Sequence, residues 1–189
     1  MKQRIIQALS QTKKQNNVLT DAPLAPAAVL VPLYEKGGEY YILFTKRTEK
    51  LEHHKGQISF PGGARHEGDK SLDDTALRET FEEIGVHSQD VEILGQLDNM
   101  GTVSSGFLIT PFVALIPYPY AFKVNPDEIE ELVEVPISAL LDKSNYWEEL
   151  QVYQGKSYRS CFYQCQGKVI WGATARILKQ FLGLVFGSD

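Results

Sequence analysis

Three glutamates stand within five positions of one another in the segment ALRETFEEIGV: Glu79, Glu82 and Glu83. At about 100° per residue, a helix would place the three carboxylates on one face. Like charges at these spacings repel one another, and no cation shares the arc, because Arg78 lies to its side. Such a cluster is either a solvated acidic surface or a set of hard oxygen ligands for Mg²⁺ or Mn²⁺. The surrounding residues decide between the two.

The helix that carries these glutamates has recognisable ends. Ser71 is a suitable N-cap and Gly85 a suitable C-cap, which predicts a helix between them. Its buried stripe is expected to consist of Leu77, Phe81 and Ile84, on the side opposite the carboxylates.

A glycine turn and a basic loop precede this helix. The turn is FPGG, residues 60–63, whose glycines permit tight backbone turns and close approach of a ligand. The loop before it is rich in basic residues: Lys46, Arg47, His53, His54 and Lys55. A carboxylate cluster that faces a basic loop across a glycine turn fits a site for a metal ion and a phosphate.

The segment GGARHEGDKSLDDTALRETFEEIGV resembles the Nudix box of the Nudix hydrolases, G-x5-E-x7-R-E-U-x-E-E-x-G-U, where U is a bulky apolar residue. The matching positions are Gly63, Arg78, Glu79, Glu82, Glu83, Gly85 and Val86. Two positions depart from the pattern. The first acid is Asp69, separated from Arg78 by eight residues instead of seven, and Thr80 takes an apolar position. The aspartate and its spacing are both similar to the coenzyme A diphosphatase branch of the family.

That branch also carries an upstream signature, L-L-T-x-R-[SA] followed by a basic residue and G-x3-F-P-G-G. The segment LFTKRTEKLEHHKGQISFPGG is similar to it at Leu43, Thr45, Arg47, Gly56, Phe60, Pro61, Gly62 and Gly63. The middle arginine of the signature is missing; Glu52 and His53 lie in that neighbourhood. VSSGFLITPFV and IWGATARIL resemble later segments of the branch, so the resemblance covers most of residues 25–182.

The resemblance implies hydrolysis of a nucleoside diphosphate linked to a further group, by attack of water on phosphorus with divalent metal ions. Glu79 and Glu83 are then the first-choice ligands, and Glu82 is a ligand or activates the water. Gly63 adds its backbone carbonyl to the metal, and Arg78 orients a glutamate through an ion pair.

The remaining roles fall on residues outside the box. In this family the general base often comes from a later loop; NPDEIEELVEVP is the candidate segment here, with Glu128 as the first choice and Glu131 next. Lys46, Arg47 and His54 are candidates to hold substrate phosphates, because basic side chains, above all the planar fork of arginine, suit phosphate oxygens.

The rest of the sequence predicts an α/β (α+β) chain with a mixed sheet sandwiched between helices, and the resemblance implies that this is the Nudix fold. Strands are expected at 27–34, 39–45, 57–60, 91–98, 108–117, 131–137 and 155–165, a helical turn at 137–141 and a closing helix at 172–186. Residues 1–20 are expected to form a helical extension and residues 21–189 the Nudix domain. The apolar Ile5, Ile6 and Leu9 predict that the extension packs on this domain or on a second subunit of a homodimer.

The composition argues against nucleic acid and membranes as partners of this protein. A net charge of −5 argues against a protein that coats nucleic acid, and no apolar run reaches the roughly 18 to 20 residues that span a bilayer. Cys161 and Cys165 fit neither a redox pair nor a zinc site and are read as reduced thiols of a cytoplasmic protein. The expected partner is the small nucleotide that the resemblance to the Nudix hydrolases implies.

Three functions remain open. The first is a Nudix diphosphatase that uses Mg²⁺ or Mn²⁺ to cleave coenzyme A or its derivatives into 3′,5′-ADP and 4′-phosphopantetheine. The second keeps this chemistry but takes ADP-ribose, a dinucleotide or an oxidised nucleoside triphosphate, and the missing arginine motivates it. The third is a non-catalytic nucleotide-binding module, suggested only by the altered first acid.

Overall fold

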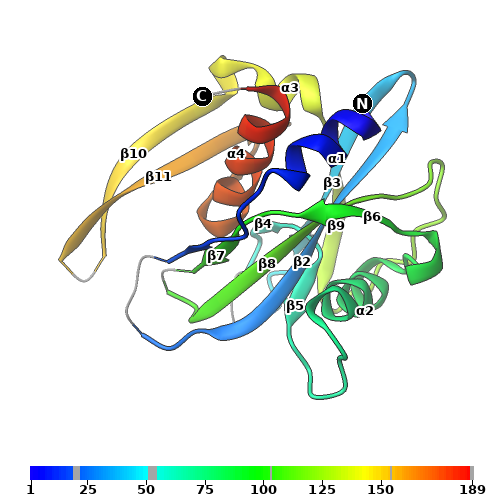
Figure 1. Ribbon diagram of the computed structural model, residues 1–189, viewed down its shortest axis with the longest axis horizontal. Helices are drawn as coiled ribbons and strands as arrows, with labels where there is room; N and C mark the ends of the chain where they lie inside the picture. Colours follow the sequence, from blue (N-terminus) through cyan, green and yellow to red (C-terminus); the bar gives the residue numbers. More distant parts are fainter. Residues whose placement is uncertain (19–21, 51–54, 103, 154, 188–189) are drawn as a thin grey trace.

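The computed structural model describes residues 1–18, 22–50, 55–102, 104–153 and 155–187. In this part of the chain a mixed β-sheet lies between helices, as the sequence predicts (Figure 1). The helices are α1 (Lys2–Ser10), α2 (Leu72–Ile84), α3 (Ile137–Leu141) and α4 (Gly172–Phe186). The strands are β1 (Asn16–Asn17), β2 (Ala25–Lys36), β3 (Glu39–Arg47), β4 (Ile58–Ser59), β5 (Gly62–Ala64), β6 (Glu92–Gln96), β7 (Asn99–Gly101), β8 (Phe107–Leu115), β9 (Ile129–Pro136), β10 (Tyr146–Tyr153), β11 (Lys156–Cys165) and β12 (Lys168–Ile170).

Among the described residues the central sheet has nine strands, in the order β1-β7-β8-β2-β3-β4, with β5, β6 and β9 paired to β2, β8 and β3. β2 runs parallel to β8 and antiparallel to β3 and β5. Its middle is almost continuously apolar because both of its faces are covered. The pairing of Ala28 with Gly63 places the glycine turn directly beside this central strand.

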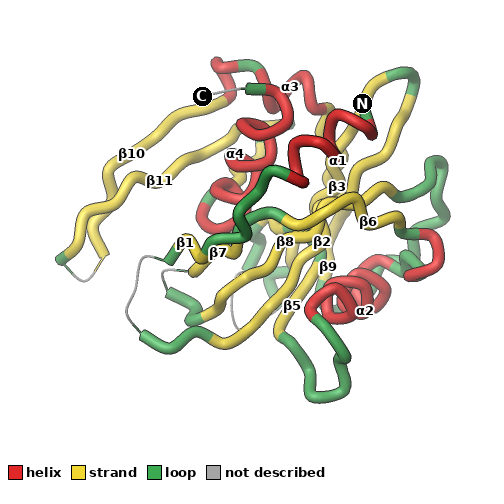
Figure 2. The backbone as a smooth tube through the Cα atoms, in the orientation of Figure 1, coloured by secondary structure: helices red, strands yellow, loops and turns green. Residues whose placement is uncertain are grey.

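Helices cover both faces of the sheet (Figure 2). On one face, Ile84 of α2 belongs to the same apolar cluster as Leu43 of β3. The next residue of β3, Phe44, points to the other face and joins the larger core, which includes Ile5 of α1 and Phe181 of α4. Because α2 contacts β2 and β5, its carboxylates lie close to the glycine turn.

The predicted ends of α2 are confirmed. The Ser71 side chain accepts a hydrogen bond from the backbone N–H of Asp74 at 3.4 Å. Gly85 is the C-cap in the left-handed conformation, with φ of 73°, and its N–H donates to the carbonyl of Phe81 at 2.9 Å. A left-handed residue at this position is typical of helix C-termini and favours glycine.

The predicted buried stripe of α2 is confirmed at Ile84 and wrong at Phe81. Phe81 is 47% exposed and its ring lies tilted against that of His87, with the centroids 4.8 Å apart, while Leu77 is only partly buried. The side that faces the sheet carries Thr75, Ala76, Thr80, Glu83 and Ile84. The strands beneath α2 present alanines and glycines (Ala28, Gly62 and Gly63), so small side chains on the helix allow a close approach.

Thr80 fits an apolar position for a related reason. Its hydroxyl donates to the carbonyl of Ala76 at 2.6 Å, so no polar group is left unsatisfied by its burial. This departure from the family pattern therefore preserves the packing of the helix on the sheet.

The N-terminal helix packs on its own chain. Ile5 and Leu9 of α1 are buried in the larger core, and Leu9 lies so close to Gly95 that a Cβ there would come within 2.9 Å of it. Arg4 lies over the ring of Phe186 at the end of α4, 5.2 Å from its centroid. Of the two packing partners predicted for this helix, its own domain is the one observed, while the predicted boundary at residue 20 lies outside the described residues.

A second sheet, of β10, β11 and β12, is the main element that the sequence did not predict in full. Of its strands only β11 was expected. β10 was missed because its apolar Leu150 and Val152 face solvent, so no alternation marks a buried face. Pairing across the strands holds it, with the rings of Trp147 and Phe162 stacked 5.1 Å apart. This antiparallel pair extends away from the body of the molecule (Figure 1).

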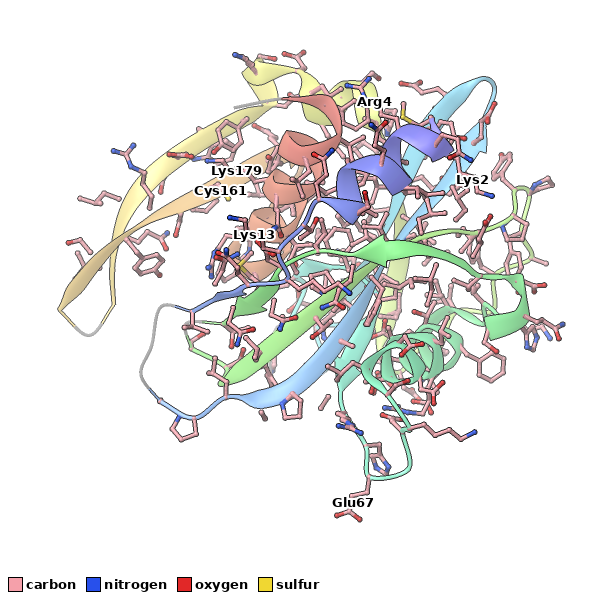
Figure 3. The ribbon with its side chains drawn as sticks, in the orientation of Figure 1. Lys2, Arg4, Lys13, Glu67, Cys161 and Lys179 are labelled. Atoms are coloured by element: carbon pink, nitrogen blue, oxygen red, sulfur yellow. The ribbon has the colours of Figure 1, made fainter. Side chains whose placement is uncertain are left out.

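Both cysteines are free, as predicted, and the structure shows them buried: Cys161 and Cys165 lie on β11 and belong to the larger core. Figure 3 shows Cys161 beside Lys179 of α4, where this strand meets the helix. Within the described residues, no helix combines the length and the apolar character needed to cross a membrane.

Candidate active site

Arg78 is the centre of an ion-pair network on α2. Its Nε and Nη2 donate to the two carboxylate oxygens of Asp69 at 2.8 and 3.0 Å. Its Nη1 donates to Glu79 at 2.8 Å and to Glu82 at 3.1 Å. The prediction that the acidic face lacks a cation is therefore wrong, because the long arginine side chain reaches over the helix surface from its off-centre position. The role that the resemblance implies for Arg78, orienting a glutamate, agrees with this geometry.

Asp69 is turned inward by four hydrogen bonds. Besides the two from Arg78, its carboxylate accepts from the backbone N–H of His66 and from the hydroxyl of Thr75, each at 2.8 Å. The Arg78 guanidinium, helped by the His66 N–H, holds the pKa of Asp69 well below its usual range. By contrast Glu67 points to solvent at the tip of the same loop (Figure 3). Asp69 thus reaches Arg78 across the longer spacing and acts as its brace.

The helical period predicts that Glu83 is exposed, but the structure shows it buried. It is only 1% exposed and faces the glycine turn, where it accepts from the N–H of Gly62 at 3.3 Å and from Arg47 Nη1 at 3.4 Å. Burial raises the pKa of Glu83 to about 8, although Arg47 and the Gly62 N–H act in the opposite direction. Both hydrogen bonds are long, so this buried carboxylate is incompletely compensated.

Glu79 lies against the backbone of Gly63. A Cβ on Gly63 would come within 2.6 Å of the Glu79 carboxyl group, so only glycine leaves room for it. Burial raises the pKa of Glu79, and the adjacent Arg78 opposes this shift. Glu82 is the most exposed of the three, with 51% of its side chain accessible. The three carboxylates therefore run from buried to exposed along the helix surface.

The donors at this site fit a hard divalent cation. Across the described part of the chain, no three acidic, histidine or cysteine side chains already converge in a metal-binding arrangement. Glu79 and Glu82 are directed to Arg78, and Glu83 to Arg47. Carboxylate oxygens are nevertheless the ligands that Mg²⁺ and Mn²⁺ prefer. A cation beside Glu83 would supply the charge compensation that its two long hydrogen bonds do not.

The two candidates for the general base lie in different surroundings. Glu128 follows a segment tied to the end of α2, where the N–H of Asn125 donates to the carbonyl of Glu83 at 2.9 Å. The charge of Glu128 also contributes to the raised pKa of Glu79 and of Glu83. The Glu131 carboxylate instead forms an ion pair with Lys168 of β12 at 2.9 Å. The fold therefore brings Glu128 to the carboxylate cluster and directs Glu131 away from it.

The three candidates for phosphate binding also separate. Arg47 contacts Glu83 and lines a cleft beside the glycine turn. Lys46 forms an ion pair with Glu130 at 2.8 Å and is not part of the cleft wall. His54 lies outside the described residues.

The cleft has a volume of about 410 Å³ and lies between the central sheet and the layer of α4 and β11. Its wall includes Arg47 and Gly63 on the side of the carboxylates. The opposite wall carries Tyr158, Trp171 and Arg176, none of which the sequence singled out. Only the resemblance of IWGATARIL to a later segment of the branch hinted at the last two. Gly63 is the point where the carboxylate cluster and the cleft meet.

Comparison with known proteins agrees with this arrangement. The chain is 41% identical over 154 residues to a protein from Photorhabdus laumondii named uncharacterized Nudix hydrolase NudL, covering 82% of this chain and 81% of that one. A protein of the same name from Yersinia enterocolitica is 38% identical over 155 residues, covering 82% and 78%.

Solved structures share the fold. An Ap4A hydrolase from C. elegans matches with a TM-score of 0.54 and 16% identity, covering 62% of this chain and 84% of that one. A MutT/nudix family protein from Enterococcus faecalis matches with a TM-score of 0.55 and 13% identity, covering 90% and 65%. The NUDIX domain family itself matches residues 24–155, which include the α2 carboxylates, the glycine turn and Glu128. The chain belongs to the Nudix hydrolase family.

Proposed function

We propose that this Nudix hydrolase cleaves the diphosphate bond of coenzyme A or its derivatives, giving 3′,5′-ADP and 4′-phosphopantetheine. The observation that carries the proposal concerns the upstream signature. Its residues Arg47, Phe60, Gly62 and Gly63 line the 410 Å³ cleft, and Arg47 and Gly62 also contact Glu83. The segment similar to the coenzyme A branch is therefore the one that joins the carboxylates to a cavity of ligand size.

The reaction is hydrolysis of a phosphoric anhydride. Water attacks one phosphorus, the bond from that phosphorus to the bridging oxygen breaks, and two phosphate monoesters leave. Glu79 and Glu83, together with Glu82 and the carbonyl of Gly63, would hold Mg²⁺ or Mn²⁺, which neutralises diphosphate charge and acidifies water when bound. Within the chain, Arg78 orients Glu79 and Glu82, and Asp69 fixes Arg78.

Proton transfer and phosphate binding involve residues outside α2. Glu128 accepts the proton of the attacking water as general base. Arg47 donates to a phosphate oxygen of the substrate, since it already reaches from the cleft wall to Glu83. The free thiols of Cys161 and Cys165 fit a reducing, cytoplasmic location.

ADP-ribose or another nucleoside diphosphate derivative is the second candidate substrate. It is favoured by one observation, the absence of the middle arginine from the upstream signature. A non-catalytic module is disfavoured, because Asp69 still braces Arg78 and the three glutamates of the box are all present.

Product analysis tests the proposal. The purified protein is offered coenzyme A, ADP-ribose and NADH side by side with Mg²⁺ or Mn²⁺, and Glu83→Gln serves as the control. We expect 3′,5′-ADP from coenzyme A and loss of this product in the variant. Cleavage mainly of ADP-ribose or NADH would mean that coenzyme A is not the substrate, while the proposed diphosphate hydrolysis still holds. No cleavage of any of the three at millimolar Mn²⁺ would favour the binding module.

A further inference from the structure

The cleft beside the glycine turn is lined by cations without carboxylates. Its wall contains two arginines, Arg47 and Arg176, and no aspartate or glutamate among the described lining residues. The whole chain, by contrast, has a net charge of −5. A cavity of this composition is complementary to an anionic ligand. Arg47 lies at the carboxylate end, where it contacts Glu83, and Arg176 lies on the other wall.

Arg176 is oriented by backbone carbonyls. Its Nη1 donates to the carbonyl of Gly101 at 2.8 Å and its Nη2 to that of Asn17 at 3.3 Å. These contacts tie α4 to β7 and β1, and they occupy two of the five N–H donors of a guanidinium. Neutral acceptors fix the direction of the side chain but leave its positive charge uncompensated.

Neighbouring cations are neutralised where Arg176 is not. Glu148 of β10 binds Lys179 at 2.7 Å and Arg159 at 3.6 Å. Arg176 forms no ion pair with any described residue, although it is partly buried and desolvation lowers its pKa. A structural tie between α4 and two carbonyls would not require a charged group here. An uncompensated guanidinium on the wall of a cleft is better explained by an anionic ligand.

A second oriented donor lies on the same wall. The side-chain oxygen of Gln151 accepts from the hydroxyls of Tyr158 at 3.2 Å and Ser160 at 2.9 Å. This arrangement turns the NH₂ group of Gln151 away from both hydroxyls, and it donates to no acceptor within the described ranges. Gln151, Tyr158, Ser160 and Arg176 all line the cleft. The wall therefore offers a charged donor and a neutral one.

We propose that Arg176, with Gln151, binds a phosphate monoester of the substrate that is separate from the diphosphate, and that Arg176 is the residue that selects for it. The inference rests on the proposed function, in which coenzyme A carries a phosphate monoester on its ribose. The diphosphate lies beside Arg47 and the carboxylates, and the second phosphate lies against the other wall.

Paired substrates and matched variants test this subsite. The wild type, Arg176→Met and Arg159→Met are compared on coenzyme A and on dephospho-coenzyme A, which lacks only the ribose phosphate. Arg159→Met is the control because it also removes one arginine charge, but from an exposed position on β11. The Arg159 side chain is 79% exposed and paired with Glu148. We expect the wild type to prefer coenzyme A about 10- to 100-fold in kcat/KM, mainly through KM. Arg176→Met should lose this preference, and Arg159→Met should keep it.

The ratio between the two substrates separates binding from folding, because a purely structural defect lowers both activities together. Arg176→Lys is made as well; it keeps the charge and should keep part of the preference, even if Arg176→Met fails to fold. Equal turnover of the two substrates by the wild type, or an unchanged preference in Arg176→Met, would overturn the inference.

A binding measurement separates this inference from the proposed function. If the wild type cleaves neither coenzyme A nor dephospho-coenzyme A, the proposed substrate is wrong. Calorimetry with 3′,5′-ADP and 5′-AMP then tests the subsite without turnover. If the wild type binds 3′,5′-ADP at least about 10-fold more tightly than 5′-AMP, and this ratio is smaller in Arg176→Met or Arg176→Lys, the site is supported. Equal affinity for the two nucleotides would exclude it.

Discussion

Arg78 and Asp69 form a two-point ion pair, with Nε–Oδ1 and Nη2–Oδ2 distances of 2.8 and 3.0 Å. The pair joins the loop after β5 to the middle of α2 and leaves Nη1 of Arg78 for Glu79 and Glu82. An acid at this position therefore acts on the two glutamates through the arginine, whether it is an aspartate or the glutamate of the family pattern.

Asp69→Ala should lower activity by about 10- to 100-fold, since this is the typical effect of losing a group that orients metal ligands, the role proposed for Glu79 and Glu82. Without Asp69, Arg78 is free to change its contacts with Glu79 and Glu82. The measurement is kcat at saturating substrate together with the Mn²⁺ concentration that gives half the activity. Glu67→Gln is the matched control, because Glu67 lies exposed in the same loop. Wild-type values for both quantities in Asp69→Ala would contradict the bracing role.

Gly63→Ala should disturb Glu79 directly. The added Cβ would lie 2.6 Å from the Glu79 carboxyl group, which must move by an ångström or so, and a shift of this size can cost on the order of 100-fold in rate. Gly68→Ala is the control, because nothing lies within 4 Å of a Cβ at that position. Comparison of kcat/KM across a range of Mg²⁺ concentrations tests the effect. Equal activity in the two variants would show that Gly63 is not needed for the position of Glu79.

The sequence predicts the ends of α2 better than its buried face. Ser71 and Gly85 act locally, through a cap and a left-handed residue, so their positions can be read from the chain alone. The buried face depends on what the helix packs against. Ala28 and the glycines of β5 bring the sheet close enough for Thr80 and Glu83 and leave Phe81 outside, which a helical wheel does not reveal.

The site divides in the same way. The box and its upstream signature identify the carboxylates and Arg47, because these residues act from short, contiguous segments. The second wall of the cleft comes from β10, β11 and α4, which lie in the C-terminal part of the chain, far beyond both segments. Gln151 lies on a strand without a buried face and Arg176 on an apolar helix, so no local pattern marks either one for the role proposed above. Only the resemblance of IWGATARIL pointed to the segment of Arg176.

Leu9→Ala should lower the free energy of unfolding by about 2–4 kcal/mol, the usual effect of truncating a buried leucine. Leu9 is buried between α1 and β6, where it contacts Gly95. Urea unfolding at several protein concentrations measures the change, with Gln7→Ala on the exposed side of α1 as the control. The loss should be independent of concentration, because α1 packs on its own chain. A loss that varies with concentration would instead assign this helix to a subunit contact.

Glu148→Gln should destabilise the protein in a pH-dependent manner. Hydrogen bonds from Lys179 and Tyr146 lower the pKa of Glu148 to about 2, from an ordinary value near 4.5. A carboxylate whose pKa is depressed in the folded state stabilises the protein fully above its unfolded pKa and loses this contribution as the pH falls toward the folded value. The difference in unfolding free energy between wild type and variant should therefore be largest near pH 7 and shrink between pH 4.5 and 2.

Urea unfolding at pH 7, 4.5 and 3 measures this difference. Lys179→Met is the partner variant, since the Lys179 ammonium lies 2.7 Å from Glu148. The stability that this ammonium contributes should also decrease as the pH falls and Glu148 becomes protonated. At pH 7 the double variant should lose less unfolding free energy than the two single variants lose together, because each substitution removes the same ion pair. A difference for Glu148→Gln that stays constant from pH 7 to pH 3 would show that the pair does not stabilise the contact between β10 and α4.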